Sequence, residues 1–258
     1  MAELARPVFL APHYDDVALS CGGTVAALAE QGLRPVIVTC FGGEPDGPLS
    51  PFAAFQHRWR GLSDEEALAI RRAEERAAAD VLGAEPLWLG LPDAIYRGAR
   101  YLSDEQLFGS LHPDDTELLP RLRTALREAL AGVGITPAWF AVPLGAGNHV
   151  DHQLVRALGH ALRREGWTVW AYEDFPYSAL EGGSRELARL ASEHAAAEPW
   201  VQPLTDNQLE RRIAAVRCYV SQLAVIFRHL GDPAEAIRQA AVEAGGGQPA
   251  ERLWLLRG

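Results

Sequence analysis

The feature that most constrains the fold of this chain is a regular alternation of two kinds of segment. Short apolar runs, rich in β-branched and aromatic residues, alternate with longer segments of Ala, Arg and Glu that carry apolar residues at helical spacing. This alternation is typical of βα units, which build a parallel sheet with helices on both faces. The expected strands span residues 7–11, 35–41, 86–90, 138–143 and 168–173. The expected helices span residues 22–31, 64–82, 116–131, 151–165, 206–228 and 232–244. The sequence therefore predicts an α/β fold, a three-layer sandwich around a mostly parallel sheet.

The chain is long enough to bury a sizeable core. It has 258 residues, of which 48% are apolar and 22% are charged. No internal repeat and no linker divides the sequence, so we expect a single domain over residues 1–258. Residues 42–63 and 92–115 are longer than ordinary connections, which predicts functional loops there.

Charge and composition narrow the class of partner. The net charge of -10 and the pI near 5.3 argue against a nucleic acid or an anionic membrane surface and favour a small molecule. The first apolar run is too short for a signal peptide, and no apolar stretch reaches the roughly 18 residues that span a bilayer. The three cysteines are odd in number and far apart, so they do not form a disulfide framework. We therefore expect a cytoplasmic protein without membrane insertion; the sequence leaves homo-oligomerisation open.

Two stretches compete for half of a metal site: "APHYDD" at 11–16 and "HPDD" at 112–115. A histidine beside two aspartates can hold a divalent metal with one carboxylate and keep the other as a base. The first stretch follows a buried strand, which is where ligands bind in doubly wound folds. The second precedes an amphipathic segment, so we interpret Asp114 or Asp115 as a helix cap. The first half of the candidate site therefore consists of His13, Asp15 and Asp16.

The second half lies in "GAGNHVDHQLV" (145–155), which also follows a buried strand. His149 and His152 are three residues apart at an expected helix start, so both imidazoles can face the same rim. The alternative is that Asn148 or Asp151 simply caps this helix. Two motifs with metal-type ligands at the ends of two strands favour the metal site.

The number and type of these ligands predict the chemistry. A catalytic zinc needs three protein ligands and an open position for water, and His13, Asp16 and His152 supply two imidazoles and one carboxylate. Asp15 then remains as the general base for the metal-bound water, and His149 as an imidazolium would stabilise an oxyanion. The same ligands also suit Fe(II). The constellation predicts metal-assisted hydrolysis of an amide or ester.

Together with the helix segment "RRAEERAAADVLG" (71–83), the motifs "PHYDD" and "HVDH" resemble the PIG-L (LmbE-like) family of zinc-dependent N-deacetylases. The resemblance covers about residues 7–165. It implies a Rossmann-like fold and hydrolysis of a linear amide C–N bond, releasing an N-acetyl group from an N-acetylglucosamine-type sugar or glycoconjugate. It also implies that Asp15 acts first as base and then as acid, and that Arg71 and Asp93 bind sugar hydroxyls. The residues alone indicate a solvated helix charge for Arg71 and a turn residue for Asp93.

The chain departs from the usual family motifs at several positions. The commonest first motif is His-Pro-Asp-Asp-Glu, whereas here Tyr14 separates the histidine from the acids and Val17 replaces the glutamate. The ligand and base positions are kept. Some relatives carry a tyrosine where this chain has Gly147, so any phenolic assistance would come from Tyr14, Tyr96 or Tyr177.

Other polar residues are interpreted as structural. Glu173, Asp174 and Tyr177 of "YEDFPYS" follow a strand and would reach the substrate, but a turn around Pro176 is the favoured interpretation. Four further histidines are assigned to the surface or the core: His57, His160, His194 and His229.

Two alternatives keep other functions open. Relatives within the family resemblance cleave larger amides or hydrate a small unsaturated acid with a similar constellation. A nucleotide-sugar-binding Rossmann-like domain would instead need a phosphate-cradling glycine pattern and basic residues at the rim. Gly22 and Gly23 do not form that fingerprint.

Overall fold

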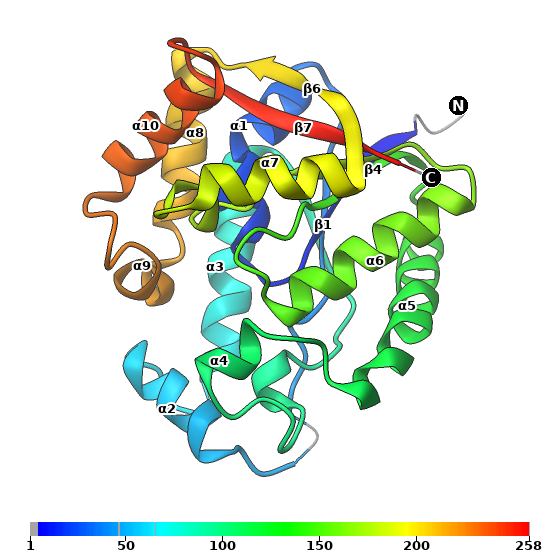
Figure 1. Ribbon diagram of the computed structural model, residues 1–258, viewed down its shortest axis with the longest axis vertical. Coiled ribbons are helices and arrows are strands. Elements are labelled where there is room, and N and C mark those ends of the chain that lie inside the picture. Colours follow the sequence, from blue (N-terminus) through cyan, green and yellow to red (C-terminus); the bar gives the residue numbers. More distant parts are fainter. Residues whose placement is uncertain (1–4, 46, 65, 258) are drawn as a thin grey trace.

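The computed structural model describes residues 5–45, 47–64 and 66–257. Its described strands form one sheet in the order β3–β2–β1–β4–β5–β7–β6 (Figure 1). The strand bounds are β1 Arg6–Ala11, β2 Val36–Thr39, β3 Glu85–Trp88, β4 Pro137–Pro143, β5 Val169–Tyr172, β6 Ala195–Pro203 and β7 Ala250–Leu256. Strands β1 to β5 pair in parallel, whereas β7 is antiparallel to both β5 and β6. The predicted mostly parallel sheet is confirmed.

Helices follow each parallel strand along the chain. Their bounds are α1 Asp16–Glu30, α2 Pro51–Trp59, α3 Ala67–Leu82, α4 Asp104–Leu107, α5 Leu118–Gly132, α6 Val150–Arg164, α7 Gly183–His194, α8 Asp206–Arg217, α9 Val220–Ile226 and α10 Pro233–Ala244. Three short 3₁₀ turns are η1 Ala94–Tyr96, η2 Pro113–Glu117 and η3 Tyr177–Ala179. None of the described helices is long and apolar enough to cross a membrane.

Side chains of β1 show why the fold has three layers. Phe9 and Ala11 belong to a core cluster with residues of α1, α3, α8 and α10, whereas Val8 and Leu10 belong to a second cluster with residues of α5, α6 and α7. Alternate side chains of a strand point to opposite faces, so each face of the sheet is covered by its own group of helices. Figure 1 shows α3, α8 and α10 on one side of the central strands and α5 and α6 on the other, with α7 crossing in front. The predicted three-layer sandwich is confirmed.

Helix α1 begins earlier than expected and is kinked. It starts at Asp16, directly within the first motif, and Cys21 departs from helical geometry with φ -145°. Glu251 of β7 accepts hydrogen bonds from the N–H groups of Gly23 and Thr24 just beyond the kink. The expected start at residue 22 therefore matches the second half of the helix, which a residue from the far end of the chain caps.

The two site motifs lie where the strand order reverses. From β1 the chain proceeds to β2 and β3 on one side, and then returns to place β4 and β5 on the other side of β1. Loops at the carboxyl ends of two such strands diverge and leave a crevice for a ligand. Because the motifs follow β1 and β4, both open into this crevice.

Candidate metal centre and active site

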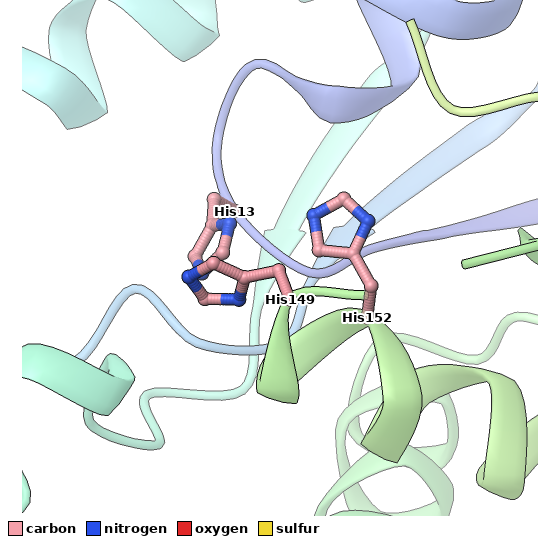
Figure 2. A group of neighbouring side chains, drawn as sticks. All are labelled: His13, His149 and His152. Carbon is pink, nitrogen blue, oxygen red and sulfur yellow. The ribbon is translucent and has the colours of Figure 1, made fainter. Parts of the chain in front are cut away.

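The structure brings the two halves of the predicted site together. His13 and Asp15 lie between β1 and α1, and Asp16 is the first residue of α1. His149 immediately precedes α6 and His152 lies in its first turn. One ring nitrogen each from His13, His149 and His152 lies within 4.8 Å of the others, and Figure 2 shows these rings grouped at the start of α6.

Asp16 lies between two of these imidazoles. Its Oδ2 is 3.3 Å from Nδ1 of His13, and its Oδ1 is 3.4 Å from Nε2 of His152. The same Oδ2 accepts a hydrogen bond from the backbone N–H of His13 at 2.7 Å, which holds the carboxylate in place. Two imidazoles and one carboxylate therefore converge as the ligand set of a catalytic zinc requires.

Each of the two candidate ligand imidazoles, His13 and His152, contacts a second carboxylate through its other ring nitrogen. Nε2 of His13 lies 3.0 Å from Asp151 Oδ2, and Nδ1 of His152 lies 2.6 Å from Asp174 Oδ1. A histidine that donates one N–H to a carboxylate presents its other nitrogen as a lone pair to a metal. These contacts leave Nδ1 of His13 and Nε2 of His152 facing Asp16.

The role of Asp174 differs from the sequence interpretation. Its Oδ2 accepts hydrogen bonds from the N–H groups of Gly145 and Ala146, so the buried carboxylate joins the loop after β4 to His152. The sequence pattern favours a plain turn around Pro176 for this segment. The one available signal was an acidic residue directly after a strand, which does not identify the histidine it contacts. Glu173 points elsewhere, to Arg252 and Trp254.

The charge of the site suits a cation. Burial opposes protonation of His152, but Asp16 and then Asp174 raise its pKa to about 9. Burial likewise opposes protonation of His13, yet Asp93, Asp151 and Asp16 hold its pKa well above the ordinary value. The buried Nε2 of His152 has no hydrogen-bond partner among the described residues. A buried polar atom without a partner, in a strongly negative environment, fits a divalent metal.

The two adjacent aspartates differ in their protonation. Burial favours the neutral form of Asp16, but His152 and His13 hold its pKa well below the ordinary value, so it is ionised as a ligand must be. Burial and the neighbouring Asp16 raise the pKa of Asp15, although the charge of Arg71 partly opposes them. A carboxyl group with a raised pKa is suited to accept a proton and return it.

The protonation expected for His149 was wrong. Burial, and then the positive charge of His13, hold the pKa of His149 well below its ordinary value, which favours the neutral imidazole. Its Nδ1 accepts a hydrogen bond from the backbone N–H of Asp151 at 3.2 Å, so Nε2 carries the hydrogen. His149 can therefore donate from a neutral N–H, which still suits an oxyanion.

The aspartates of "HPDD" do not cap a helix, contrary to the sequence interpretation. The side chain of His112 caps η2 by accepting from the N–H of Asp114, and Glu117 is the N-cap residue of α5. Asp114 is largely exposed, whereas Asp115 is completely buried.

Asp115 supports the site from a distance. Arg97 and the Tyr101 hydroxyl each donate to its Oδ2 at 2.9 Å, and Arg100 pairs with its other oxygen. The guanidinium of Arg97 also donates to Asp151 at 2.5 Å, and Asp151 holds His13. A chain of buried charges thus runs from Asp115 to a candidate metal ligand.

Arg71 and Asp93 line the same pocket as Asp15 and His149. Arg71 Nη1 lies 3.8 Å from Asp93 Oδ2, and its buried Nε has no hydrogen-bond partner in the described part of the chain. Asp93 also caps η1 through the N–H of Ile95, as the turn interpretation expected. Arg71 is buried within the pocket wall rather than solvated.

The two long connections contribute a large part of the pocket wall. Segment 42–63 contains α2 and lines the pocket with Gln56, His57, Trp59, Arg60 and Leu62, whereas 92–115 adds η1 and α4. Large apolar side chains at the mouth remain partly exposed: Trp59 at 42%, Phe108 at 37% and Leu180 at 38%. The pocket therefore combines a polar floor with an apolar rim.

The three tyrosines considered for phenolic assistance separate into two groups. Tyr14 is buried outside the pocket, where its hydroxyl donates to the Gly42 carbonyl at 2.6 Å. Tyr96 and Tyr177 line the pocket. A side chain at Gly147 would overlap the Tyr177 ring, because a Cβ built there lies 2.5 Å from the ring carbons.

Gly22 and Gly23 do not face the pocket. A Cβ on Gly22 would meet Arg212 at 3.1 Å, and one on Gly23 would meet Leu204 at 2.5 Å. These glycines allow α1 to pack closely on neighbouring elements, which argues against a phosphate-binding role.

Comparisons with known proteins agree with this geometry. The sequence profile described as GlcNAc-PI de-N-acetylase (PIG-L) matches residues 8–163. A 2'-N-acetylparomamine deacetylase from Niallia circulans is 31% identical over 202 residues, covering 70% of this chain and 72% of the relative. A protein of the same name from Streptomyces fradiae is 28% identical over 223 residues, covering 84% of this chain and 73% of the relative. A solved structure of a deacetylase–bog complex from teicoplanin biosynthesis is 25% identical, with a TM-score of 0.82 over 98% of each chain. The chain belongs to the GlcNAc-PI de-N-acetylase (PIG-L) family.

Proposed function

We propose that this protein is a zinc-dependent N-deacetylase that hydrolyses the acetamido group of an N-acetylglucosamine-type sugar or glycoconjugate. The observation that carries the proposal is the position of Asp16 between His13 and His152, with Asp15 in the adjoining pocket. The ligands would be His13 Nδ1, an Asp16 oxygen and His152 Nε2. Their carboxylate anchors, Asp151 and Asp174, support this assignment.

When bound, a divalent metal supplies Lewis-acid chemistry, because it acidifies water and polarises a carbonyl oxygen. Asp15 accepts a proton from the attacking water as the new C–O bond forms. Nε2–H of His149 donates a hydrogen bond to the developing oxyanion. Asp15 then returns the proton to the sugar nitrogen as the C–N bond breaks, and the products are acetate and a free amine.

A second candidate ligand set is less well supported. Besides the three imidazoles of His13, His149 and His152, the residues His13, Asp93 and Asp151 have ligand atoms within 4.8 Å of one another. However, Asp151 already accepts hydrogen bonds from Arg97 and from the N–H of Ala94. Its oxygens are therefore occupied as acceptors, which favours an anchoring role.

The proposed substrate class rests on the pocket and on the relatives. Arg71 and Asp93 offer a donor and an acceptor at the pocket wall, which suits adjacent sugar hydroxyls. Relatives named 2'-N-acetylparomamine deacetylase support an N-acetylated amino sugar. The apolar rim suits a substrate that carries an apolar group beyond the sugar.

The test combines elemental analysis with an assay for new primary amines. Purified protein is incubated with N-acetylglucosamine, its alkyl and aryl glycosides, and 2'-N-acetylparomamine, before and after chelation. We expect about one zinc per chain and amine release that chelation abolishes and zinc restores. Reconstitution with Fe(II) measures whether the second metal also supports turnover.

Zinc binding without amine release from any member of the panel would contradict the deacetylase proposal. Protein that binds no divalent metal would contradict the ligand assignment itself.

A further inference from the structure

A hydrogen-bonded chain of three side chains, which includes none of the candidate ligands, reaches the pocket. His57 lies in α2, and its Nε2 is 2.6 Å from the hydroxyl oxygen of Tyr96 in η1. Its Nδ1 is 2.7 Å from Oδ1 of Asp64. His57 and Tyr96 are buried and both line the pocket, whereas the Asp64 side chain is 48% exposed. The sequence pattern assigns His57 to the surface or the core; the structure places it in the buried wall of the pocket with two side-chain partners.

The chemistry of the three groups sets the direction of these bonds. The Asp64 carboxylate only accepts, so Nδ1 of His57 donates to it, and in this tautomer Nε2 presents a lone pair to the Tyr96 hydroxyl. Burial and the charge of Asp93 raise the pKa of Tyr96, so its phenol retains its hydrogen. That hydrogen is donated to Nε2 of His57. The Tyr96 oxygen consequently has free acceptor capacity.

The position of Tyr96 places this acceptor beside the proposed sugar-binding residues. The backbone N–H of Tyr96 donates to the carbonyl of Asp93 at 2.8 Å, so both belong to one tight turn. Tyr96, Asp93 and Arg71 line the same pocket. His57, itself bonded to Asp64, fixes the orientation of the Tyr96 hydroxyl. A tyrosine with a packing role alone does not require its hydroxyl to be oriented.

We propose that Tyr96 is a specificity-determining residue whose oxygen, oriented by His57 and Asp64, accepts a hydrogen bond from one hydroxyl group of the sugar. This inference rests on the proposed function, since it names a contact of that same site. His57 and Asp64 act through Tyr96 as positioning residues. The bond between His57 and Tyr96 also joins the two long connections, 42–63 and 92–115.

The test compares kcat/KM for the wild type and Tyr96→Phe on the methyl glycoside of N-acetylglucosamine and on monodeoxy analogues that each lack one hydroxyl. We expect Tyr96→Phe to lose about fivefold to tenfold on the parent sugar, which is the value of one neutral hydrogen bond. On one analogue the variant and the wild type should be equal, because the contacted hydroxyl is already missing. Asp64→Asn should show the same pattern with a smaller loss.

Tyr172→Phe is the matched control, because its hydroxyl donates to the carbonyl of Leu10 in the core and not to the pocket. Tyr172→Phe should change kcat/KM by the same factor on every sugar. If Tyr96→Phe lowers kcat/KM by one factor on all analogues, or on none, the inference is overturned while the deacetylase proposal stands. A wild-type protein that releases no amine from these glycosides would overturn both.

Discussion

Adjacent residues of the first motif, Asp15 and Asp16, have different surroundings, which supports the different roles proposed for them. Asp16 is the first residue of α1 and is held by two imidazoles, whereas Asp15 lies in the pocket under the influence of Arg71. The residue types and their order after a strand lead to the same proposed division, which stays a prediction. Sequence could not predict that the pKa of His149 is lowered, because this pKa depends on burial and on the approach of His13.

Replacing Asp15 should separate catalysis from metal binding. Asp15→Asn removes the proton acceptor and keeps the ligands, so we expect zinc content to stay near one per chain and turnover to fall by about 10²- to 10⁴-fold. His152→Ala should lose both zinc and turnover. Zinc analysis and amine release on the same samples measure this. Loss of zinc from Asp15→Asn would mean that Asp15 is itself a ligand.

The two aspartates of "HPDD" should differ sharply in their contribution to stability. Asp115→Ala leaves Arg97 buried without one of its carboxylate partners, so we expect a loss of about 3–5 kcal/mol in the free energy of unfolding. Asp114→Ala, at an exposed position, should change it by less than about 0.5 kcal/mol. Urea unfolding of both variants measures the difference. Equal effects would contradict the role given to the buried network.

At the scale of the elements, periodicity predicted the central strands and most of the long helices. It missed β6 and β7, which form an antiparallel edge with weak alternation, and α7, which lies in a segment expected to be a loop. The expected helix 206–228 is two helices, α8 and α9. Apolar spacing continues across the break at Tyr219, so sequence did not reveal it. The break is decided by tertiary contacts, since the Tyr219 hydroxyl donates to Glu75 of α3.

Glu75 should make the packing of α9 on α3 sensitive to pH. Burial is the main cause that raises its pKa to about 8, and its Oε1 has no hydrogen-bond partner among the described residues. The folded protein therefore holds a proton that the unfolded chain, with an ordinary glutamate, releases near pH 4.3. This stabilisation is complete below that pH and is lost as the pH rises toward 8.

Glu75→Gln cannot ionise, so its stability relative to the wild type should rise by up to about 1.4 kcal/mol per pH unit between pH 5 and 8. Urea unfolding at several pH values in that range measures this trend. Glu128→Gln, at an exposed position of α5, is the matched control. A difference between Glu75→Gln and wild type that does not change with pH would show that Glu75 is ionised in the fold.

At the scale of the whole molecule, the proposed metal site connects distant parts of the sheet. Its candidate ligands follow β1 and β4, and the carboxylates that contact them come from α6 and from the loop after β5. A ligand that binds the folded state alone stabilises that state in proportion to the logarithm of its concentration over Kd. Metal binding should therefore stabilise the whole fold and not the motifs alone.

Removing the Asp174 carboxylate that contacts His152 should weaken zinc binding and therefore the stabilisation of the fold by zinc. We expect zinc at 100-fold above Kd to stabilise the wild type by about 2.7 kcal/mol. Asp174→Asn should need about 10- to 100-fold more zinc for the same rise in Tm. Glu173→Gln is the control, because its carboxylate contacts Arg252 and Trp254 instead. Identical zinc titrations for Asp174→Asn and the wild type would contradict the anchoring role.

The sequence by itself determined the α/β class, the strands that precede the site, and the ligand and base candidates. These features depend on residues a few positions apart, which periodicity and short motifs record. Only the tertiary structure decided which groups support them. Asp151 contacts His13 from 138 residues away in the sequence, and Asp174 contacts His152 from 22 residues away. Glu251 accepts a hydrogen bond from Gly23, which is 228 residues away. Such contacts depend on strand order and on burial, and neither is encoded in local spacing.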